Sequence, residues 1–310
     1  MKSIAAILFL LTAPLLAGEF PWSDNVPADI AASSLHHDQV VDEIPCNWRP
    51  VIKPLFAPQV AHCKSAREAV LHIAANIGAI TGVYYTPNRR KHNMNALEAL
   101  AEKKVSCTGQ SVLLVCALRS VDIPARAVGV LTWNHVRGNH TWVEAWFDGE
   151  WHMIEFNEKD FNTSWVMENI GMLCTSKPTQ RIRAATPAGK QWWIPLPFQK
   201  TPNFKADDVT ERYMKLARKW YEENGLPAHS QRLLVNVPNR REQAPILELV
   251  NSEGVVISAG KLPTTSDDMR YFTRLELPRS GTHFFRINGS NQLTPVRATD
   301  APVQIISLNY

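Results

Sequence analysis

Three residues of this chain have the types, and the order along the chain, that a thiol-based catalytic set needs: Cys107, His140 and Glu155. A thiol is a good nucleophile only as a thiolate, so it needs a base to take its proton and a third group to orient that base. We expect Cys107 to be the nucleophile, His140 the base and Glu155 the orienting acid. Such a set attacks a carbonyl carbon and passes through a thioester.

The sequence around Cys107 predicts the start of a helix. Ser106 is a good N-cap, and residues 112–118 continue as a helix that is apolar nearly all round and therefore buried. The positive end of such a helix stabilises a thiolate and offers backbone N–H groups to a developing oxyanion. We expect Gln110 and Trp142 to line the cleft at this site.

The acid depends on the register of a predicted hairpin. Residues 140–147 alternate, Asp148-Gly149 is a typical two-residue turn, and residues 151–156 form the return strand. With a two-residue turn, Glu155 lies on the face of His140 and diagonal to it, close enough to bond its ring. One extra loop residue would instead place Glu158 opposite His140.

Four motifs in a fixed order resemble one known family. They are Ser-Cys-Thr-Gly-Gln-Ser at 106–111, Ala-Leu-Arg-Ser-Val-Asp-Ile-Pro-Ala-Arg-Ala-Val at 117–128, Gly-Asn-His-Thr-Trp-Val-Glu at 138–144 and Gly-Glu-Trp-His-Met-Ile-Glu at 149–155. Together they look like the core of the transglutaminase-like superfamily, which includes transglutaminases, bacterial cysteine proteases and peptide N-glycanases. The resemblance covers roughly residues 65–170. In that superfamily a Cys at a helix start, a His on the next strand and an Asp form a papain-like triad.

The resemblance implies a secreted bacterial enzyme that acts on a peptide or carboxamide bond. Cys107 and His140 match the family pattern directly, whereas Glu155 stands where an Asp is usual. Relatives with this His motif often carry the acid later in the sequence, so Glu158 and Asp160 remain alternative candidates for the orienting acid. The implied activity is that of a cysteine protease, amidase or acyltransferase with a protein, peptide or glycopeptide substrate. The rival interpretation is a catalytically inactive member of the superfamily that binds glycan or protein.

The composition and the N-terminal residues restrict the class of protein to which this chain can belong. The chain has 310 residues, of which 45% are hydrophobic and 20% charged, as in a globular protein large enough for two domains. Lys2, the apolar run 4–16 and the small residues Ala17-Gly18 predict a signal peptide at 1–18, too short for a comfortable membrane span. We therefore expect a secreted or periplasmic protein with no stable membrane span. The net charge of +4, without a basic stripe, argues against a nucleic-acid partner.

Export would permit disulfides, and five cysteines leave one over after pairing. We expect Cys46 and Cys63 to be bonded, because both lie in a Pro-containing segment with little apolar periodicity, whereas Cys116 and Cys174 are expected to be free. Neither His-Glu-x-x-His nor Cys-x-x-Cys occurs, so neither a metal site nor a cofactor is expected. Arg126 is expected to form an ordinary surface ion pair.

The predicted organisation is an α+β protein with two domains after the leader. Residues 19–64 form an irregular lead, 65–228 the transglutaminase-like catalytic domain, and 229–310 a small antiparallel, Ig-like β-sandwich. Helical patterns cover 66–80, 95–103 and 207–223. The strands expected in the sandwich are 232–237, 245–251, 254–259, 270–277, 282–287 and 303–308.

Overall fold

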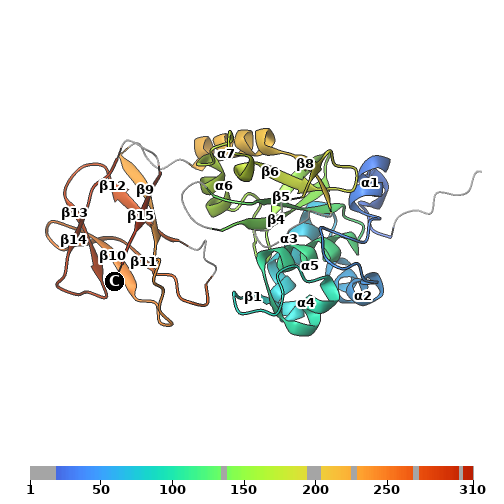
Figure 1. The fold of residues 1–310 in the computed structure, drawn as a ribbon, viewed down its shortest axis with the longest axis horizontal. Coiled ribbons are helices and arrows are strands. Elements are labelled where there is room, and N and C mark those ends of the chain that lie inside the picture. Colours follow the sequence, from blue (N-terminus) through green and yellow to red (C-terminus); the bar gives the residue numbers. More distant parts are fainter. Residues whose placement is uncertain are drawn as a thin grey trace, which may run out of the picture.

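The computed structural model describes residues 19–133, 138–193, 204–224, 229–267, 272–299 and 303–309. The predicted signal peptide, residues 1–18, lies outside the described residues. Figure 1 shows a larger body that combines helices with a sheet and a smaller body made of strands. Within the described ranges, no helix is both long enough and apolar enough to cross a membrane.

The larger body is built on a six-stranded antiparallel sheet with the order β5-β4-β3-β6-β8-β7. Helices cover both of its faces, with α6 and α7 above the sheet and α3 and α5 below it in Figure 1. The strands are β3 Ala125–Val130, β4 His140–Phe147, β5 Glu150–Ile154, β6 Ile182–Ala185, β7 Gln191–Trp192 and β8 Lys205–Asp208. The helices are α1 Ala28–Ser34, α2 Arg49–Val60, α3 Ala66–Thr81, α4 Ala96–Glu102, α5 Cys107–Arg119, α6 Ser164–Gly171 and α7 Thr210–Asn224. The short elements are η1 Ser23–Asn25, η2 Pro178–Gln180 and the parallel pair β1 Tyr84–Tyr85 and β2 Lys104–Val105.

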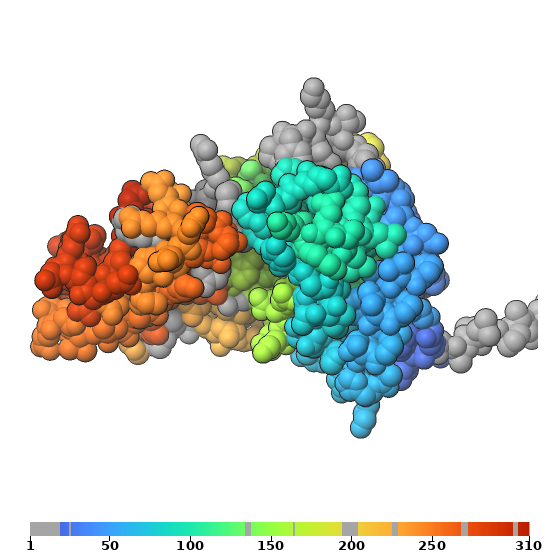
Figure 2. Space-filling model, turned by 90° about the horizontal axis from the view of Figure 1, so that it is seen from below, coloured from blue at the N-terminus to red at the C-terminus, as the bar shows by residue number. Residues whose placement is uncertain are grey.

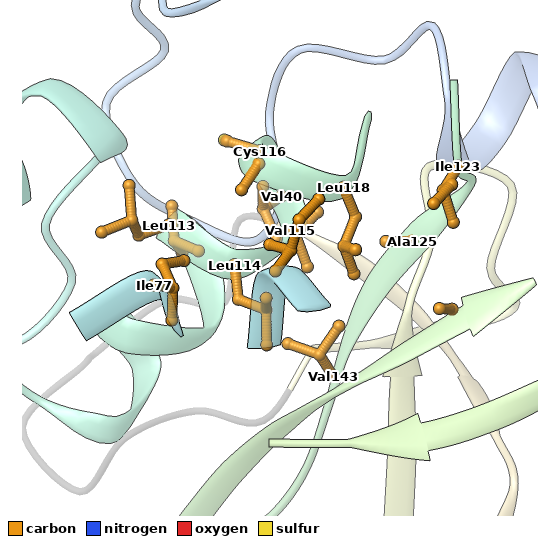
Figure 3. Packing of buried hydrophobic residues seen from close by; sticks show 14 of the residues in the cluster. Val40, Ile77, Leu113, Leu114, Val115, Cys116, Leu118, Ile123, Ala125 and Val143 are labelled. Atoms are coloured by element: carbon orange, nitrogen blue, oxygen red, sulfur yellow. The ribbon is translucent and has the colours of Figure 1, made fainter. Parts of the chain in front are cut away.

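Helix α5 runs through the centre of the core, as its apolar sequence predicts. Its leucines are fully buried, and Figure 3 shows them packed among Ile77 of α3, Val143 of β4 and Ala125 of β3. Burial of one such leucine stabilises the fold by roughly 1.5–3 kcal/mol. The helix is therefore held firmly against β3 and β4, and this fixes the position of its first residue, Cys107.

The predicted irregular lead contains the helices α1 and α2. Helix α2 holds Pro54 and Pro58 in its interior, where a proline removes a backbone hydrogen bond and normally breaks a helix. Ile52, Phe56 and Val60, four residues apart, are nevertheless buried in the same core as α5. Tertiary packing of this apolar stripe thus outweighs the proline penalty, and the prediction of an irregular segment was wrong.

The same helix separates the two cysteines that were expected to bond. Cys46 and Cys63 are not joined by a disulfide in the structure. Cys46 and Cys63 lie beyond opposite ends of α2, whose 12 residues span about 18 Å. A disulfide requires Cα atoms within about 7 Å, so the predicted Cys46–Cys63 bond is wrong.

The smaller body is a β-sandwich of two sheets, with the orders β11-β10-β13-β14 and β12-β9-β15. Its strands are β9 Ser230–Asn236, β10 Ile246–Asn251, β11 Val256–Lys261, β12 Thr273–Pro278, β13 His283–Ile287, β14 Thr294–Val296 and β15 Val303–Ser307. Six of the seven were expected from the sequence. The sandwich is antiparallel except that β15 pairs in parallel with β9. In Figure 2 the sandwich, coloured orange to red, lies against the cyan and green surface of the larger body.

Arg126 is buried instead of lying on the surface. Its Nε donates to Glu144 Oε2 at 2.8 Å, and Arg212 of α7 donates to the other oxygen of the same carboxylate. Burial alone would raise the pKa of Glu144, but the two guanidinium groups outweigh it and hold that pKa below its usual value. The expected ion pair of Arg126 is confirmed, and its expected surface position is wrong.

Candidate active site

Cys107 is the first residue of α5, where the sequence predicted it. Ser106 is the N-cap, and its hydroxyl accepts a hydrogen bond from the Gly109 N–H at 3.0 Å. At Gly109 a Cβ atom would approach the Cβ of Val105 to 2.9 Å, so the chain before the helix packs directly on its first turn. The side chain of Cys107 is nearly buried. The thiol is therefore carried on a tightly packed helix start, at the positive end of the helix dipole.

Two hydrogen bonds fix this helix start against the strand that carries His140. The hydroxyls of Thr108 and Thr141 lie 3.0 Å apart, and Ser111 Oγ donates to the Thr141 carbonyl at 3.0 Å. All three residues are buried. Thr141 directly follows His140, so these bonds set the position of β4 relative to the first turn of α5. None of these three residues was predicted to belong to the site; polar side chains at positions 108 and 111 of an apolar helix were the available signal.

The hairpin forms with the expected two-residue turn. Asp148 and Gly149 both have positive φ, 50° and 81°, as a type I′ turn requires. Phe147 pairs with Glu150, and Glu144 pairs with Met153. The predicted register is confirmed, and it directs the residue after β5 toward the start of β4.

That residue is Glu155, and its carboxylate bonds His140. Oε1 lies 2.5 Å from Nε2 of the imidazole, and Oε2 accepts a hydrogen bond from the Thr163 hydroxyl at 2.6 Å. Both His140 and Glu155 are buried. The expected contact between these two residues is confirmed. A base role toward Cys107 would use the other ring nitrogen, Nδ1.

The two alternative acids have other surroundings. Glu158 lines the same cavity as Glu155, and burial, followed by the charge of Glu155, raises its pKa. Asp160 is exposed. The register that would have turned Glu155 away from His140 is not the one formed, so Glu155 is the acid in the predicted orienting position.

Aromatic residues cover the imidazole. The ring of Trp165, from α6, lies 4.5 Å from that of His140 between centroids, and the ring of Trp142 lies 5.7 Å away. The indole N–H of Trp142 donates to the hydroxyl of Tyr213 at 2.7 Å, so it is engaged within the protein. Trp165 was missed by the sequence analysis because no local pattern relates it to residues 25 positions earlier.

These residues open into a cavity of about 650 Å³. Cys107, His140 and Glu155 line it, and Gln110 and Trp142 do so as predicted. The sandwich supplies a further wall, which the sequence analysis did not foresee: Leu234, Gly260, Lys261, Ser266, Asp267, Phe272, Thr273 and Arg274. Among the described residues, no group of three or more His, Cys, Asp or Glu side chains is arranged to hold a metal ion. The arrangement suits nucleophilic chemistry by a thiol on a substrate held between the two bodies.

Comparison with known proteins gives one family match. Residues 54–156 match the model of the transglutaminase-like superfamily, so the resemblance inferred from the motifs is confirmed for this part of the chain. No curated protein matches the chain.

Two solved structures resemble the chain at low sequence identity. A putative cysteine protease from Cytophaga hutchinsonii is 18% identical over 44% of this chain and 44% of its own, with a TM-score of 0.36. A red sea bream transglutaminase is 9% identical over 89% of this chain and 65% of its own, with a TM-score of 0.41. This chain thus spans less than two thirds of the length of either protein.

Proposed function

We propose that this chain, with its transglutaminase-like domain at 54–156, is a thiol-dependent hydrolase of peptide or carboxamide bonds. Cys107 is the nucleophile, His140 the general base and acid, and Glu155 the residue that orients His140. The observation that carries the proposal is the 2.5 Å hydrogen bond between His140 and Glu155, inside the cavity that Cys107 also lines. The second hydrogen bond of Glu155, from Thr163, supports it because it holds the longer side chain in one orientation.

The reaction divides into two steps. Cys107 Sγ gives its proton to His140 and attacks the carbonyl carbon, while N–H groups at the start of α5 stabilise the oxyanion. The C–N bond then breaks, the leaving amine takes the proton from His140, and a thioester remains. Water, deprotonated by His140, attacks the thioester. The C–S bond then breaks and releases the carboxylic acid product, and the Cys107 thiolate recovers the proton from His140. Glu155 stays ionised and stabilises the imidazolium in both steps.

Hydrolysis and transfer differ only in what attacks the thioester. An amine in place of water would give an acyltransferase with the same triad. We favour hydrolysis because water is always present at such a site, and no amine-binding site is evident in the sequence.

The proposal is tested by the reactivity of the thiols. Iodoacetamide at pH 7 should label Cys107 at least 10-fold faster than Cys46 and Cys63, whose thiol pKa values burial raises. Cys174 is the competitor to remove by Cys174→Ser, because it is partly exposed and its pKa is lowered by a hydrogen bond with Ser176.

A burst of product from p-nitrophenyl acetate, lost in Cys107→Ala, should accompany this labelling. Slow labelling of Cys107 together with no burst would support the rival function, an inactive protein that binds glycan or protein.

We further propose that the chain is exported, which residues 1–18 support by their apolar run and small final residues. Expression in a bacterial host should yield protein in the periplasm or medium, and its intact mass should correspond to a chain that begins at Glu19. Intact protein that starts at Met1 in the cytoplasm would contradict export.

A further inference from the structure

A second cavity in the larger body also borders Cys107. It has a volume of about 250 Å³ and is lined otherwise by residues that the proposed triad does not use. Of the described residues, only Cys107 lines both this cavity and the larger one that contains His140. Its size lies just below the ~300 Å³ at which typical ligand pockets begin. The second cavity therefore suits one side chain or chain end of a substrate.

The loop between β1 and α4 lines part of this cavity and contributes Arg89 and His92 to it. Ser106 Oγ donates a hydrogen bond to the His92 carbonyl at 2.5 Å, so the loop is attached to the N-cap residue of α5. The guanidinium of Arg89 donates from Nη1 to the Thr86 carbonyl at 2.7 Å and from Nη2 to Nδ1 of His92 at 2.9 Å. These three bonds hold Arg89 beside the helix start that carries Cys107.

Arg89 brings a positive charge to this cavity that no acid of the described residues balances. Each of its terminal nitrogens carries two N–H groups and uses one of them in the bonds above, and none of the described carboxylates pairs with it. Burial, followed by the charge of Arg89, holds the pKa of His92 below its ordinary value, so at pH 7 the charge is that of Arg89. The described lining of the second cavity has no Asp or Glu, whereas the larger cavity is lined by Glu155, Glu158 and Asp267. An uncompensated cation in a small cavity attracts an anion.

The two cavities correspond to different parts of a substrate. In the proposed reaction the leaving amine takes its proton from His140, so the leaving group must lie in the cavity that His140 lines. The second cavity borders Cys107, and His140 is not among the residues that line it. It therefore suits the acyl part of the substrate, which stays bonded to Cys107 Sγ in the thioester.

We propose that the second cavity binds an anionic oxygen group, a carboxylate or a phosphate, on the acyl part of the substrate and that Arg89 pairs with it. The planar guanidinium suits either group, because its parallel N–H donors can meet two oxygens at once. Arg89 is thus a substrate-binding residue that selects acidic substrates. This inference rests on the proposed function of Cys107, since the cavity serves a substrate that the thiol attacks.

The test compares two small reagents that differ in charge. Iodoacetate and iodoacetamide alkylate a thiolate by the same displacement, and the first carries a carboxylate where the second carries a carboxamide. Their rate constants at Cys107 are measured by peptide mass spectrometry at pH 7 for the wild type, Arg89→Gln, Arg89→Lys and Arg90→Gln. The ratio of the two rate constants does not depend on the thiolate fraction, because both reagents react with the thiolate. Arg90→Gln is the matched control, since Arg90 is paired with Glu98 and Glu102 and does not line the cavity.

The ratio of the iodoacetate rate constant to the iodoacetamide rate constant should fall at least ~5-fold in Arg89→Gln and less than ~2-fold in Arg90→Gln. Arg89→Lys keeps the charge and should lose less of the ratio than Arg89→Gln. Equal ratios in the wild type and Arg89→Gln would overturn the inference. Failure of iodoacetamide to label Cys107 in the wild type would instead overturn the proposed function.

A second measurement needs no variant and applies even if Arg89→Gln does not fold. Sodium acetate or sodium phosphate is added to the wild type at an ionic strength held constant with sodium chloride. At least one of the two anions should slow alkylation of Cys107 by iodoacetate relative to chloride alone. Protection by acetate would identify the bound group as a carboxylate, and protection by phosphate would identify it as a phosphate. Absence of protection by both anions would overturn the inference.

Discussion

Glu155 is one methylene longer than the aspartate that the family resemblance implies for the orienting acid, and its surroundings explain how a longer acid fits. Its two oxygens are bonded to different partners, His140 and Thr163. Both partners restrict the rotation of the side chain, so the extra methylene does not loosen the contact with the imidazole. The orienting role assigned to Glu155 follows from this geometry and is open to a direct test.

Replacing Glu155 by Gln should lower turnover at least ~100-fold, because a neutral amide no longer stabilises the imidazolium, while the fold is preserved. Steady-state hydrolysis of p-nitrophenyl acetate and thermal melting measure the two effects. Glu158→Gln is the matched control and should retain most of the activity. Wild-type turnover in Glu155→Gln together with loss in Glu158→Gln would show that the other carboxylate orients His140.

Glu158 should make the stability of the protein depend on pH. Its pKa is raised by burial and by the charge of Glu155, so the folded state binds the proton more tightly than the unfolded state. The contribution of Glu158 to the free energy of unfolding is fully present below the pKa of this group in the unfolded state, about 4.3. It is lost as the pH rises through the pKa of the group in the folded state. Glu158→Gln should therefore raise the urea midpoint relative to the wild type at pH 7 and leave it nearly unchanged at pH 4. A difference that is larger at pH 4 than at pH 7 would contradict this account.

At the scale of single elements, the start of α5 depends on close contact between backbone segments. The Ser106 cap and the absence of a side chain at Gly109 let residues 104–105 pack on the first turn of the helix. The contacts of Thr108 and Ser111 with Thr141 then fix the position of β4 relative to the first turn of α5. The position of the thiol is thus determined by the residues next to it in the chain as much as by the core behind it.

Gly109→Ala should disturb this arrangement. The new Cβ would lie 2.9 Å from the Cβ of Val105, a distance that requires the chain to move. We expect a loss of roughly 1–3 kcal/mol in the free energy of unfolding, measured with urea, and slower labelling of Cys107 by iodoacetamide. Gln110→Ala, one residue further along the same helix, should leave the free energy of unfolding within about 0.5 kcal/mol of the wild type. Unchanged stability in Gly109→Ala would show that Val105 can move away from the new Cβ without any loss in the free energy of unfolding.

At the scale of the whole molecule, one carboxylate joins the two bodies beside the cavity. Glu168 of α6 is buried and pairs with Arg232 of β9 and Arg274 of β12. The helix that carries it also carries Trp165, which packs on His140. The placement of the sandwich is therefore coupled to the same helix that covers the imidazole.

Glu168→Gln should weaken this attachment, because two arginines would lose a buried negative partner. Amide hydrogen exchange should become at least 10-fold faster in α6 and in β9 and β12 of the sandwich, and it should stay unchanged in β3 and β4. The control is Glu248→Gln, which breaks the 2.6 Å pair with Arg286 inside the sandwich and should not affect α6. Unchanged exchange in α6 and β9 of Glu168→Gln would show that other contacts hold the bodies together.

Features encoded by neighbouring residues could be predicted from the sequence. The N-cap at Ser106 and the apolar run after it locate the start of α5, and the Asp148-Gly149 turn determines the register that brings Glu155 to His140. Both signals act within about ten residues, where propensity, turn chemistry and side-chain period are sufficient. The strands of the sandwich were predicted for the same reason.

Features that depend on distant contacts were decided by the tertiary structure alone. Local chemistry argues against α2, with its two internal prolines, and only burial of Ile52 and Phe56 in the shared core accounts for it. Three features bring together segments that no sequence periodicity relates. They are the pairing of Arg126 with Glu144, the packing of Trp165 on His140 and the wall of the cavity that the sandwich supplies. The sequence by itself therefore determined the catalytic candidates and their local supports. The enclosure around them was decided only by tertiary packing, because burial and pairing depend on both partners at once.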